Sequence, residues 1–314
     1  MRDEYKNFIK IGESVHASIP SMGKLMREVF DDTDEKAVAL NAIKAKIIEQ
    51  AEKGASYIDV NVDDYFAENA DRAAELMRTF VTLVAESGCG IPACIDSSND
   101  ELVIEGLRAW YSTGVSADLR PMVNSIKPGN MDVLFPLAKD MPYVFIALMM
   151  TEGVLTTAEE ALNSVLERTG LVLDTALASG FTPSDIYYDT AAFPIAIDLP
   201  MNPGEPGRTW LAFESIKAMA NSRKYAGVHF SLGISNCFRN LPGPKLPITV
   251  AYLAKACEYG LDAGIVNVCG KLFDDEPQPE LLELVDSFAK LNGDADSIMN
   301  AMTLITNYCS SQRK

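Results

Sequence analysis

One pattern repeats along the chain: a short apolar run with a polar end is followed by a longer stretch with apolar residues at helical spacing. Eight such units are present, which is typical of strands that alternate with helices around a parallel sheet. Eight units in about 290 residues fit a closed (β/α)₈ TIM barrel, whose usual size is about 250 residues before insertions. The alternation alone leaves a doubly wound open sheet as the alternative.

The element boundaries are expected where the apolar pattern changes. The expected strands span residues 8–13, 57–62, 91–96, 122–125, 143–149, 186–189, 228–236 and 264–268. The expected helices span residues 34–53, 67–87, 100–112, 131–139, 157–180, 208–220, 248–259 and 278–290, with a loop between the first strand and the first helix. We expect a single domain over residues 1–314, with the barrel at about 8–290 and an extra C-terminal helix at about 294–308.

Asp or Asn at the ends of several expected strands is the main functional signal. A single such residue is also typical of a helix cap, which is the role expected of Ser98 or Asn99. In a barrel, however, the carboxyl ends of all strands meet at one face, and active sites lie there. The sequence therefore predicts that four strand-end residues share one site: Asp96, Asn124, Asp189 and Asn236.

These four side chains are planar acceptors and donors, with no Lys or Arg among them. A carboxylate can accept a pair of N–H bonds, and an Asn amide can match a mixed donor–acceptor edge. The expected ligand is therefore a flat neutral heterocycle edged with N–H and C=O groups, whereas phosphate would be repelled. Asn236 can donate and accept without carrying charge, so it can follow a proton on a weakly basic nitrogen and is the predicted catalytic residue.

Composition excludes several other functions. The net charge of −17 argues against nucleic-acid binding. The two His residues, His16 and His229, lie in no metal-binding motif, and no phosphate-binding glycine motif occurs, so neither a metal site nor a nucleotide fold is expected. No apolar run reaches the ~18–20 residues of a membrane span, and the charged N-terminus does not read as a signal peptide, so we expect a soluble cytoplasmic protein with reduced cysteines.

Several segments together resemble the pterin-binding methyltransferase family. This family includes the methyltetrahydrofolate:corrinoid protein methyltransferases and the methylcobalamin:tetrahydrofolate methyltransferases, and it is related to dihydropteroate synthases. The resemblance extends from about residue 8 to about residue 270. It is carried by Ile11-Gly12-Glu13-Ser14, Tyr57-Ile58-Asp59-Val60-Asn61-Val62, Ile95-Asp96-Ser97-Ser98-Asn99, Asn124-Ser125, Tyr188-Asp189, Gly233-Ile234-Ser235-Asn236 and Leu261-Asp262-Ala263.

The resemblance implies a (β/α)₈ barrel that forms a homodimer and binds tetrahydrofolate at its mouth. It places Asn236 at folate N5, the atom that carries the methyl group. The pterin-binding residues that it implies are Asp96, Asn124, Asp189, Asn236, Gly233 and Ser235. Further candidates are Glu13, Asn61 and Arg239.

The chain departs from the family pattern at three places. The first motif continues Ser14-Val15-His16 rather than Arg-Ile-Asn, Arg239 stands where Gln is usual, and Thr190-Ala191 replaces Pro-Leu after Asp189. Pterin binding remains expected, while the partner and the direction of transfer are less constrained. One branch of the family moves the methyl group from methylcobalamin onto tetrahydrofolate during demethylation of methylated amines or betaines, and we expect this chain to belong there.

The corrinoid is expected to come from outside the chain. Corrinoid-binding domains of this class carry Asp-x-His-x-x-Gly, and neither His16 nor His229 has that context. A separate corrinoid protein or free cobalamin is therefore expected, received by the loops at 193–208 and 239–247. Two alternatives remain: a dihydropteroate synthase-like enzyme, which needs basic residues for a pyrophosphate leaving group, and a non-catalytic barrel subunit of a corrinoid complex.

Overall fold

Eight parallel strands form one curved sheet in the computed structural model, which describes residues 2, 5–116, 118–150, 157–200, 202 and 204–312. Their order is β7-β6-β5-β4-β3-β2-β1-β8, so β1 to β6 each pair with the next strand in sequence and β8 pairs with β1. The strands are β1 (Ile9–His16), β2 (Tyr57–Asn61), β3 (Ala93–Asp96), β4 (Met122–Ile126), β5 (Val144–Leu148), β6 (Ile186–Asp189), β7 (His229–Ser231) and β8 (Ala263–Val266).

The two edges of the sheet meet between β7 and β8. The backbone N–H of Ile265 donates to the carbonyl of Leu232 at 3.0 Å, and Gly233 and Ile265 form an isolated parallel bridge. The result is a nearly closed barrel, which confirms the predicted (β/α)₈ fold class over the open doubly wound sheet.

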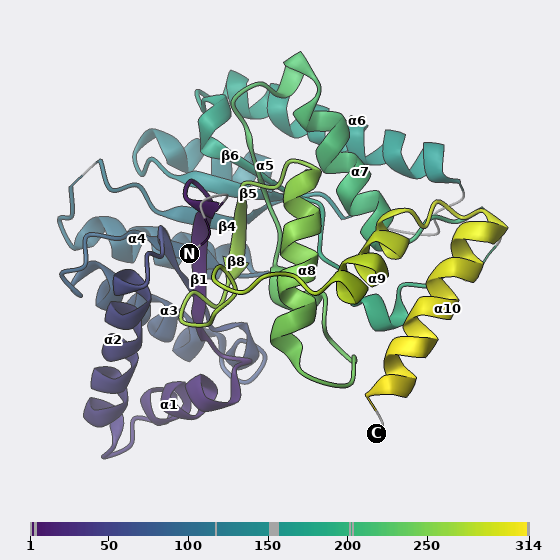
Figure 1. The fold of residues 1–314 in the computed structure, drawn as a ribbon. Coiled ribbons are helices and arrows are strands. Elements are labelled where there is room, and N and C mark those ends of the chain that lie inside the picture. Colours follow the sequence, from purple (N-terminus) through teal and green to yellow (C-terminus); the bar gives the residue numbers. More distant parts are fainter. Residues whose placement is uncertain are drawn as a thin grey trace.

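Helices surround the strands, as Figure 1 shows. They are α1 (Pro20–Phe30), α2 (Lys36–Glu52), α3 (Ala70–Ala85), α4 (Asp100–Ser112), α5 (Met131–Leu134), α6 (Ala158–Ala178), α7 (Arg208–Ala220), α8 (Lys245–Glu258), α9 (Pro279–Ala289) and α10 (Ala295–Ser311). A large core lies between sheet and helices, and a smaller cluster that includes Ile11, Met122 and Ile146 fills the barrel interior. The interior is therefore packed below the mouth, as TIM barrels require.

Several predicted boundaries are confirmed because local signals set them. The α6 helix begins after Thr157, whose hydroxyl accepts a hydrogen bond from the backbone N–H of Glu160 at 3.2 Å. The α4 helix begins after Asn99, whose side chain accepts from the backbone N–H of Glu101 at 2.8 Å. These caps satisfy N–H groups that have no partner inside a helix.

The prediction of a continuous loop between the first strand and the first helix was wrong, because α1 forms within that segment. Met22, Met26, Val29 and Phe30 are buried at helical spacing on the inner face of α1. Gly23 conceals this pattern, since glycine is a poor helix former. It is needed there because a Cβ at this position would lie 2.5 Å from the carbonyl oxygen of Ala17.

Most predicted strand ends shift by one or two residues, and two strands differ more from the prediction. β1 continues to His16, three residues beyond the expected end at residue 13. β7 is only His229–Ser231, and Ile234–Asn236 form a single 3₁₀ turn instead of the end of a strand. This turn brings the side-chain amide of Asn236 close to Gly233.

The C-terminal helix supports a loop at the barrel mouth. The hydroxyl of Tyr308 in α10 donates to the carbonyl of Pro242 at 2.9 Å. Gly243 has a φ of 87°, and a Cβ there would meet the side chain of Gln312. The loop between β7 and α8 is thus held from outside by α10.

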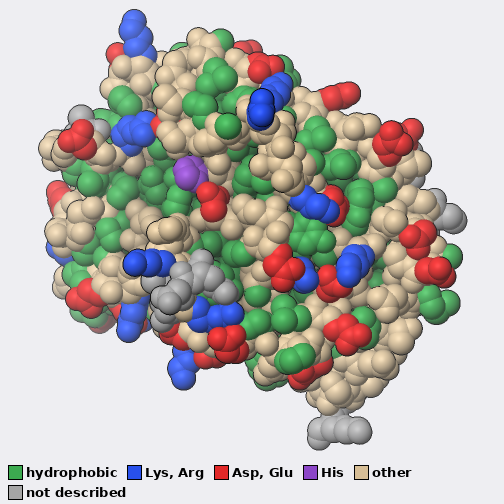
Figure 2. All heavy atoms as spheres, turned by 45° about the horizontal axis from the view of Figure 1, so that its top comes forward, with side chains coloured by type: hydrophobic (Ala, Val, Ile, Leu, Met, Phe, Trp, Pro, Cys, Tyr) green, Lys and Arg blue, Asp and Glu red, His purple; other side chains and the backbone are tan. Residues whose placement is uncertain are grey.

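Charge is dispersed on the face shown in Figure 2, where acidic and basic side chains are interspersed with small apolar groups. Among the described residues, no helix has the length and apolar character needed to cross a membrane.

Close packing of α4 against β3 should be essential for stability. A Cβ at Gly106 would lie 2.5 Å from Cγ2 of Ile95, the residue before Asp96. We expect Gly106→Ala to lower the free energy of unfolding by about 1–3 kcal/mol through overpacking. Gly129→Ala is the matched control, because a Cβ there meets nothing within 4 Å. Chemical denaturation measures both, and equal effects of the two substitutions would contradict this assignment.

Candidate functional site at the barrel mouth

A cavity of about 560 Å³ opens at the carboxyl ends of the strands. Acidic and amide groups line much of it, and basic groups also contribute. The lining residues are Glu13, His16, Ser18, Ile19, Asp59, Asp63, Asp96, Ser97, Ser98, Asn124, Ser125, Lys127, Leu148, Asp189, Gly233, Ser235, Asn236, Phe238, Arg239, Lys245 and Ile265. A cavity of this size accommodates a small organic ligand.

The structure brings the four predicted residues together on this cavity. Asp96 is the last residue of β3, Asn124 lies in β4, Asp189 is the last residue of β6, and Asn236 ends the 3₁₀ turn after β7. Asp96 is paired in register with Asn124, which places these two side by side across the sheet. Their roles in binding and catalysis remain predictions.

Gly233 and Ser235 position the Asn236 amide. The backbone N–H of Asn236 donates to the carbonyl of Gly233 at 3.0 Å, which closes the turn. A Cβ at Gly233 would lie 2.9 Å from Nδ2 of Asn236, so a larger residue there would displace the amide. Ser235 donates from its hydroxyl to Oε1 of Glu13 at 2.8 Å, which connects the turn to β1.

Asp189 is held by the backbone that follows it. The N–H of Ala191 donates to Oδ1 of Asp189 at 2.7 Å, and Ala191 has a φ of 65°, a left-handed conformation that alanine rarely adopts. Burial raises the pKa of Asp189 to about 7, and the bond from Ala191 opposes the shift. The local strain is consistent with a side chain that is fixed in one orientation.

Asp96 has a similarly perturbed carboxyl group. Burial raises its pKa to about 7, while a hydrogen bond from Asn61 and the charge of Lys127 oppose the shift. The carboxylates of Asp63 and Asp189 act in the same direction as burial. Asn61 itself does not line the cavity; its amide oxygen accepts from the backbone N–H of Asp63 at 3.0 Å, so it supports Asp96 and Asp63 from the side.

Asp59 and His16 were not singled out as site residues in the sequence. Asp59 is fully buried in β2, and its oxygens lack a hydrogen-bond partner in the described part of the chain apart from a contact with the weak thiol donor of Cys94. Burial, followed by the charge of Asp96, raises the pKa of Asp59 well above its usual range. Burial without compensating hydrogen bonds therefore favours the protonated form of this carboxyl group.

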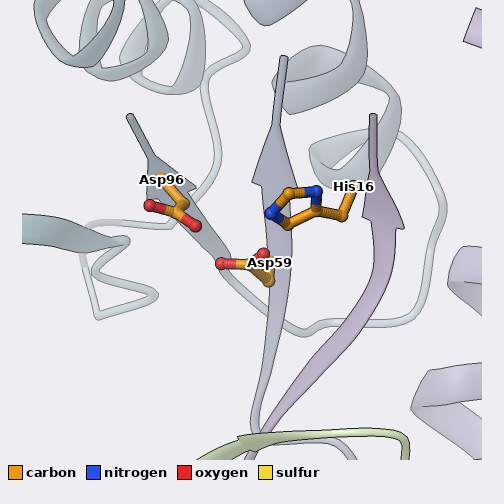
Figure 3. Close-up of side chains that lie close together, drawn as sticks. All are labelled: His16, Asp59 and Asp96. Carbon is orange, nitrogen blue, oxygen red and sulfur yellow. The ribbon is translucent and has the colours of Figure 1, made fainter. Parts of the chain in front are cut away.

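His16 faces these two acids at the end of β1. Figure 3 shows a ring nitrogen of His16 directed toward Asp59 and Asp96, and one ligand atom from each residue lies within 4.8 Å of the others. No other such metal-compatible group is found among the described residues. The backbone N–H of Ser18, however, donates to Nδ1 at 3.1 Å, so the neutral ring carries its proton on Nε2. With its proton on Nε2, the neutral ring has no free lone pair directed at the two acids, which does not favour a metal ligand.

Burial lowers the pKa of His16, and the charge of Arg239 acts in the same direction. The carboxylates of Asp63 and Asp64 oppose this shift. Burial also raises the pKa of Glu13, whereas the hydrogen bond from Ser235 and the charge of Arg239 lower it. The cavity thus contains several acids that resist ionisation and an imidazole that resists protonation, as functional sites often do.

The Pterin binding enzyme family model matches residues 29–267, which is most of the chain. The chain belongs to the pterin-binding enzyme family. A methylcorrinoid:tetrahydrofolate methyltransferase from Eubacterium limosum is 26% identical over 264 residues, covering 82% of this chain and 84% of the relative.

Solved structures with the same fold include two dihydropteroate synthases. The enzyme from Coxiella burnetii, in complex with pteroic acid, aligns with a TM-score of 0.57 and 11% identity, over 98% of this chain and 95% of that chain. The enzyme from Anaplasma phagocytophilum, with bound 6-hydroxymethylpterin-monophosphate, aligns with a TM-score of 0.52 and 15% identity, over 95% and 99%. At these identities the similarity establishes the fold alone.

The raised pKa of Asp59 predicts a pH-dependent stability difference. The unfolded chain releases this proton near pH 4 and the folded chain retains it, so ionisation favours unfolding as the pH rises. In Asp59→Asn this penalty is absent. We expect its unfolding free energy to rise relative to wild type as the pH increases above about 4, by up to ~1.4 kcal/mol per pH unit while the folded chain retains the proton.

Urea denaturation at a series of pH values measures this difference. Asp34→Asn, at an exposed carboxyl group, is the control for the loss of one acid. A difference between Asp59→Asn and wild type that does not change with pH would show that Asp59 ionises normally.

Proposed function

We propose that this enzyme transfers a methyl group between N5 of tetrahydrofolate and the cobalt of a corrinoid, from methylcobalamin to tetrahydrofolate in the demethylation of methylated amines or betaines. The observation that carries the proposal is that Asp96, Asn124, Asp189 and Asn236 line one cavity. The relative from Eubacterium limosum, a methylcorrinoid:tetrahydrofolate methyltransferase, supports the same reaction.

In this proposal the acids hold the pterin by its edge. Asp189 and Asp96 accept N–H bonds from the amino-pyrimidinone ring, and Asn124 matches a mixed donor–acceptor edge. The backbone N–H of Ala191 keeps Asp189 oriented, and Asn61 supports Asp96. Gly233 and Ser235 contribute by fixing the turn that carries Asn236.

Asn236 acts at the reacting nitrogen. The N5 lone pair forms the new N–C bond, the Co–C bond breaks with both electrons remaining on cobalt, and N5 loses one proton. The Asn236 amide accepts from N5–H before transfer and donates to the N5 lone pair afterwards by reorienting, so it follows the change in protonation without itself ionising. The reverse reaction uses the same contacts in the opposite order.

The corrinoid is proposed to come from a separate corrinoid protein or from free methylcobalamin. The loops at 193–208 and 239–247 flank the strand ends from which it would approach, although residues 201 and 203 lie outside the described residues. A homodimer is proposed on the family resemblance alone.

The basic side chains at the cavity favour one competing function. Lys127, Arg239 and Lys245 line the mouth, and a dihydropteroate synthase-like reaction needs such groups for its pyrophosphate leaving group. Incubation with a hydroxymethyldihydropterin pyrophosphate and p-aminobenzoate tests it directly. Formation of dihydropteroate, without methyl transfer in an anaerobic assay, would replace the leading proposal.

Removal of the Asn236 amide should impair the chemical step more than binding. We expect Asn236→Ala to lower kcat for methyl transfer from methylcobalamin to tetrahydrofolate by about 10²-fold, the order found when one preorganised transition-state donor is lost. Asn221→Ala, on an exposed Asn at the end of α7, is the control. Anaerobic spectroscopy that follows cob(I)alamin measures both, and unchanged turnover in Asn236→Ala would remove its catalytic role.

Folate binding should tighten as the pH rises through 7. Asp96 and Asp189 accept a pair of N–H bonds well only when ionised, because protonation turns one oxygen into a donor, and the pKa of each is raised to about 7. Below that value the ionised fraction of each acid falls about tenfold per pH unit, so the Kd for tetrahydrofolate should rise steeply from about pH 7 to about pH 6. Fluorescence titration at a series of pH values measures the Kd. Asp189→Asn should bind tetrahydrofolate more weakly than wild type, and its Kd should change less with pH. A flat profile in wild type would contradict the proposal.

A further inference from the structure

Three basic side chains line the cavity mouth above its acidic floor. Lys127 lies in the loop after β4. Arg239 lies in the loop that follows β7, and Lys245 is the first residue of α8, directly after that loop. We call Lys127, Arg239 and Lys245 the basic rim. Within the part of the chain that the structure describes, no carboxylate forms an ion pair with any of them, although many other Lys and Arg residues are paired.

We propose that the basic rim binds the glutamate carboxylates of the folate tail, so that the enzyme prefers folates with more than one glutamate. This inference rests on the proposed function, because it assumes that the pterin occupies the cavity floor. A folate has its neutral ring at one end and its carboxylates at the other, with an aromatic p-aminobenzoyl group between them. The floor and rim present groups complementary to these ends in the same order.

The charges of the basic rim influence the ionisation of side chains inside the cavity. The charge of Arg239 opposes protonation of both Glu13 and His16, and the charge of Lys127 favours ionisation of Asp96. Lys127 follows β4 and Arg239 follows β7, so the two cations reach the cavity from different strand ends. An anionic tail that leaves the floor can meet both of them at the mouth.

The helix dipole does not favour Lys245 at its position. It is the first residue of α8, where the positive end of the helix dipole disfavours a cation, and the first turn contains no acidic residue to offset it. Its ammonium group lies 5.1 Å from the ring centre of Phe238, another cavity residue. Lys245 is thus held beside an aromatic surface at the mouth, where it can meet a carboxylate that follows an aromatic group.

The remaining lining fits the middle of the same ligand. Ile19, Leu148 and Phe238 provide apolar surface at the cavity, and the Tyr308 bond to Pro242 restrains the loop between Arg239 and Lys245. The whole chain carries a net charge of −17, which repels a polyanionic folate at long range. Local cations are therefore needed if such a ligand is to bind, and the rim supplies them.

The test compares Kd values for tetrahydropteroate, tetrahydrofolate and its triglutamate, measured anaerobically without corrinoid. We expect wild type to bind the triglutamate about tenfold or more tightly than the monoglutamate, with a preference that weakens as salt increases. In Arg239→Gln/Lys245→Gln this ratio should fall to about 1–2. Lys139→Gln/Arg223→Gln is the matched control, since both residues are exposed and lie before the next strand begins, at the opposite end of the barrel.

Each outcome separates the inference from the proposed function. Equal Kd values for the two folates in wild type, or a ratio that the rim substitutions leave unchanged, would overturn the tail subsite alone. Absence of binding even for tetrahydropteroate would overturn the proposed function. A thermal melt of Lys245→Gln should be unchanged or higher than wild type, which rules out misfolding as the cause of weaker tail binding.

A second arm tests whether the rim instead binds a phosphate of the corrinoid. KM is compared for methylcobalamin and for methylcobinamide, which lacks the nucleotide-loop phosphate. We expect the rim substitutions to leave the ratio of these two KM values unchanged. A change in that ratio, with the glutamate preference intact, would assign the rim to the corrinoid and overturn the proposal.

Discussion

Burial of several carboxyl groups at one barrel mouth is the constraint on which the site depends. Asp59, Asp96 and Asp189 all line the cavity, yet removal from bulk solvent raises the pKa of each. Full ionisation of all three would leave unpaired like charges in a medium that screens them poorly. These carboxyl groups therefore favour shared protons, and a ligand with N–H donors relieves the cost by binding the ionised forms.

The fold supplies the rigidity that this arrangement needs. Asp96 and Asn124 are fixed by strand register, Asp189 by the left-handed backbone at Ala191, and Asn236 by a turn whose glycine leaves room for the amide. Each device costs stability locally, through strain, close approach or buried charge. The packed interior and the helices around the sheet compensate for these costs, so the mouth can retain groups that would destabilise a smaller domain.

The barrel and the four central residues could be predicted because both follow from short-range rules. Apolar periodicity gives the strands and helices, and the parallel arrangement then brings strand ends such as Asp96 and Asp189 to one face. Asp59 could not be recognised from its position within a buried strand, because only register shows that it reaches the cavity. His16 was missed since the first strand runs three residues further than expected, and α1 was hidden by Gly23. Lys127 lies in a loop and Lys245 begins α8 after a loop, and the course of the loop before Lys245 depends on tertiary contacts such as the Tyr308–Pro242 bond.

The most direct test of the shared-proton account is the number of protons released when tetrahydrofolate binds. Anaerobic isothermal titration calorimetry near pH 7, in buffers with different ionisation enthalpies, gives this number without any assumption about turnover. The account predicts net release of protons by wild type, because the ligand binds ionised Asp96 and Asp189, and a smaller release by Asp189→Asn. Binding with no proton release in wild type would contradict it.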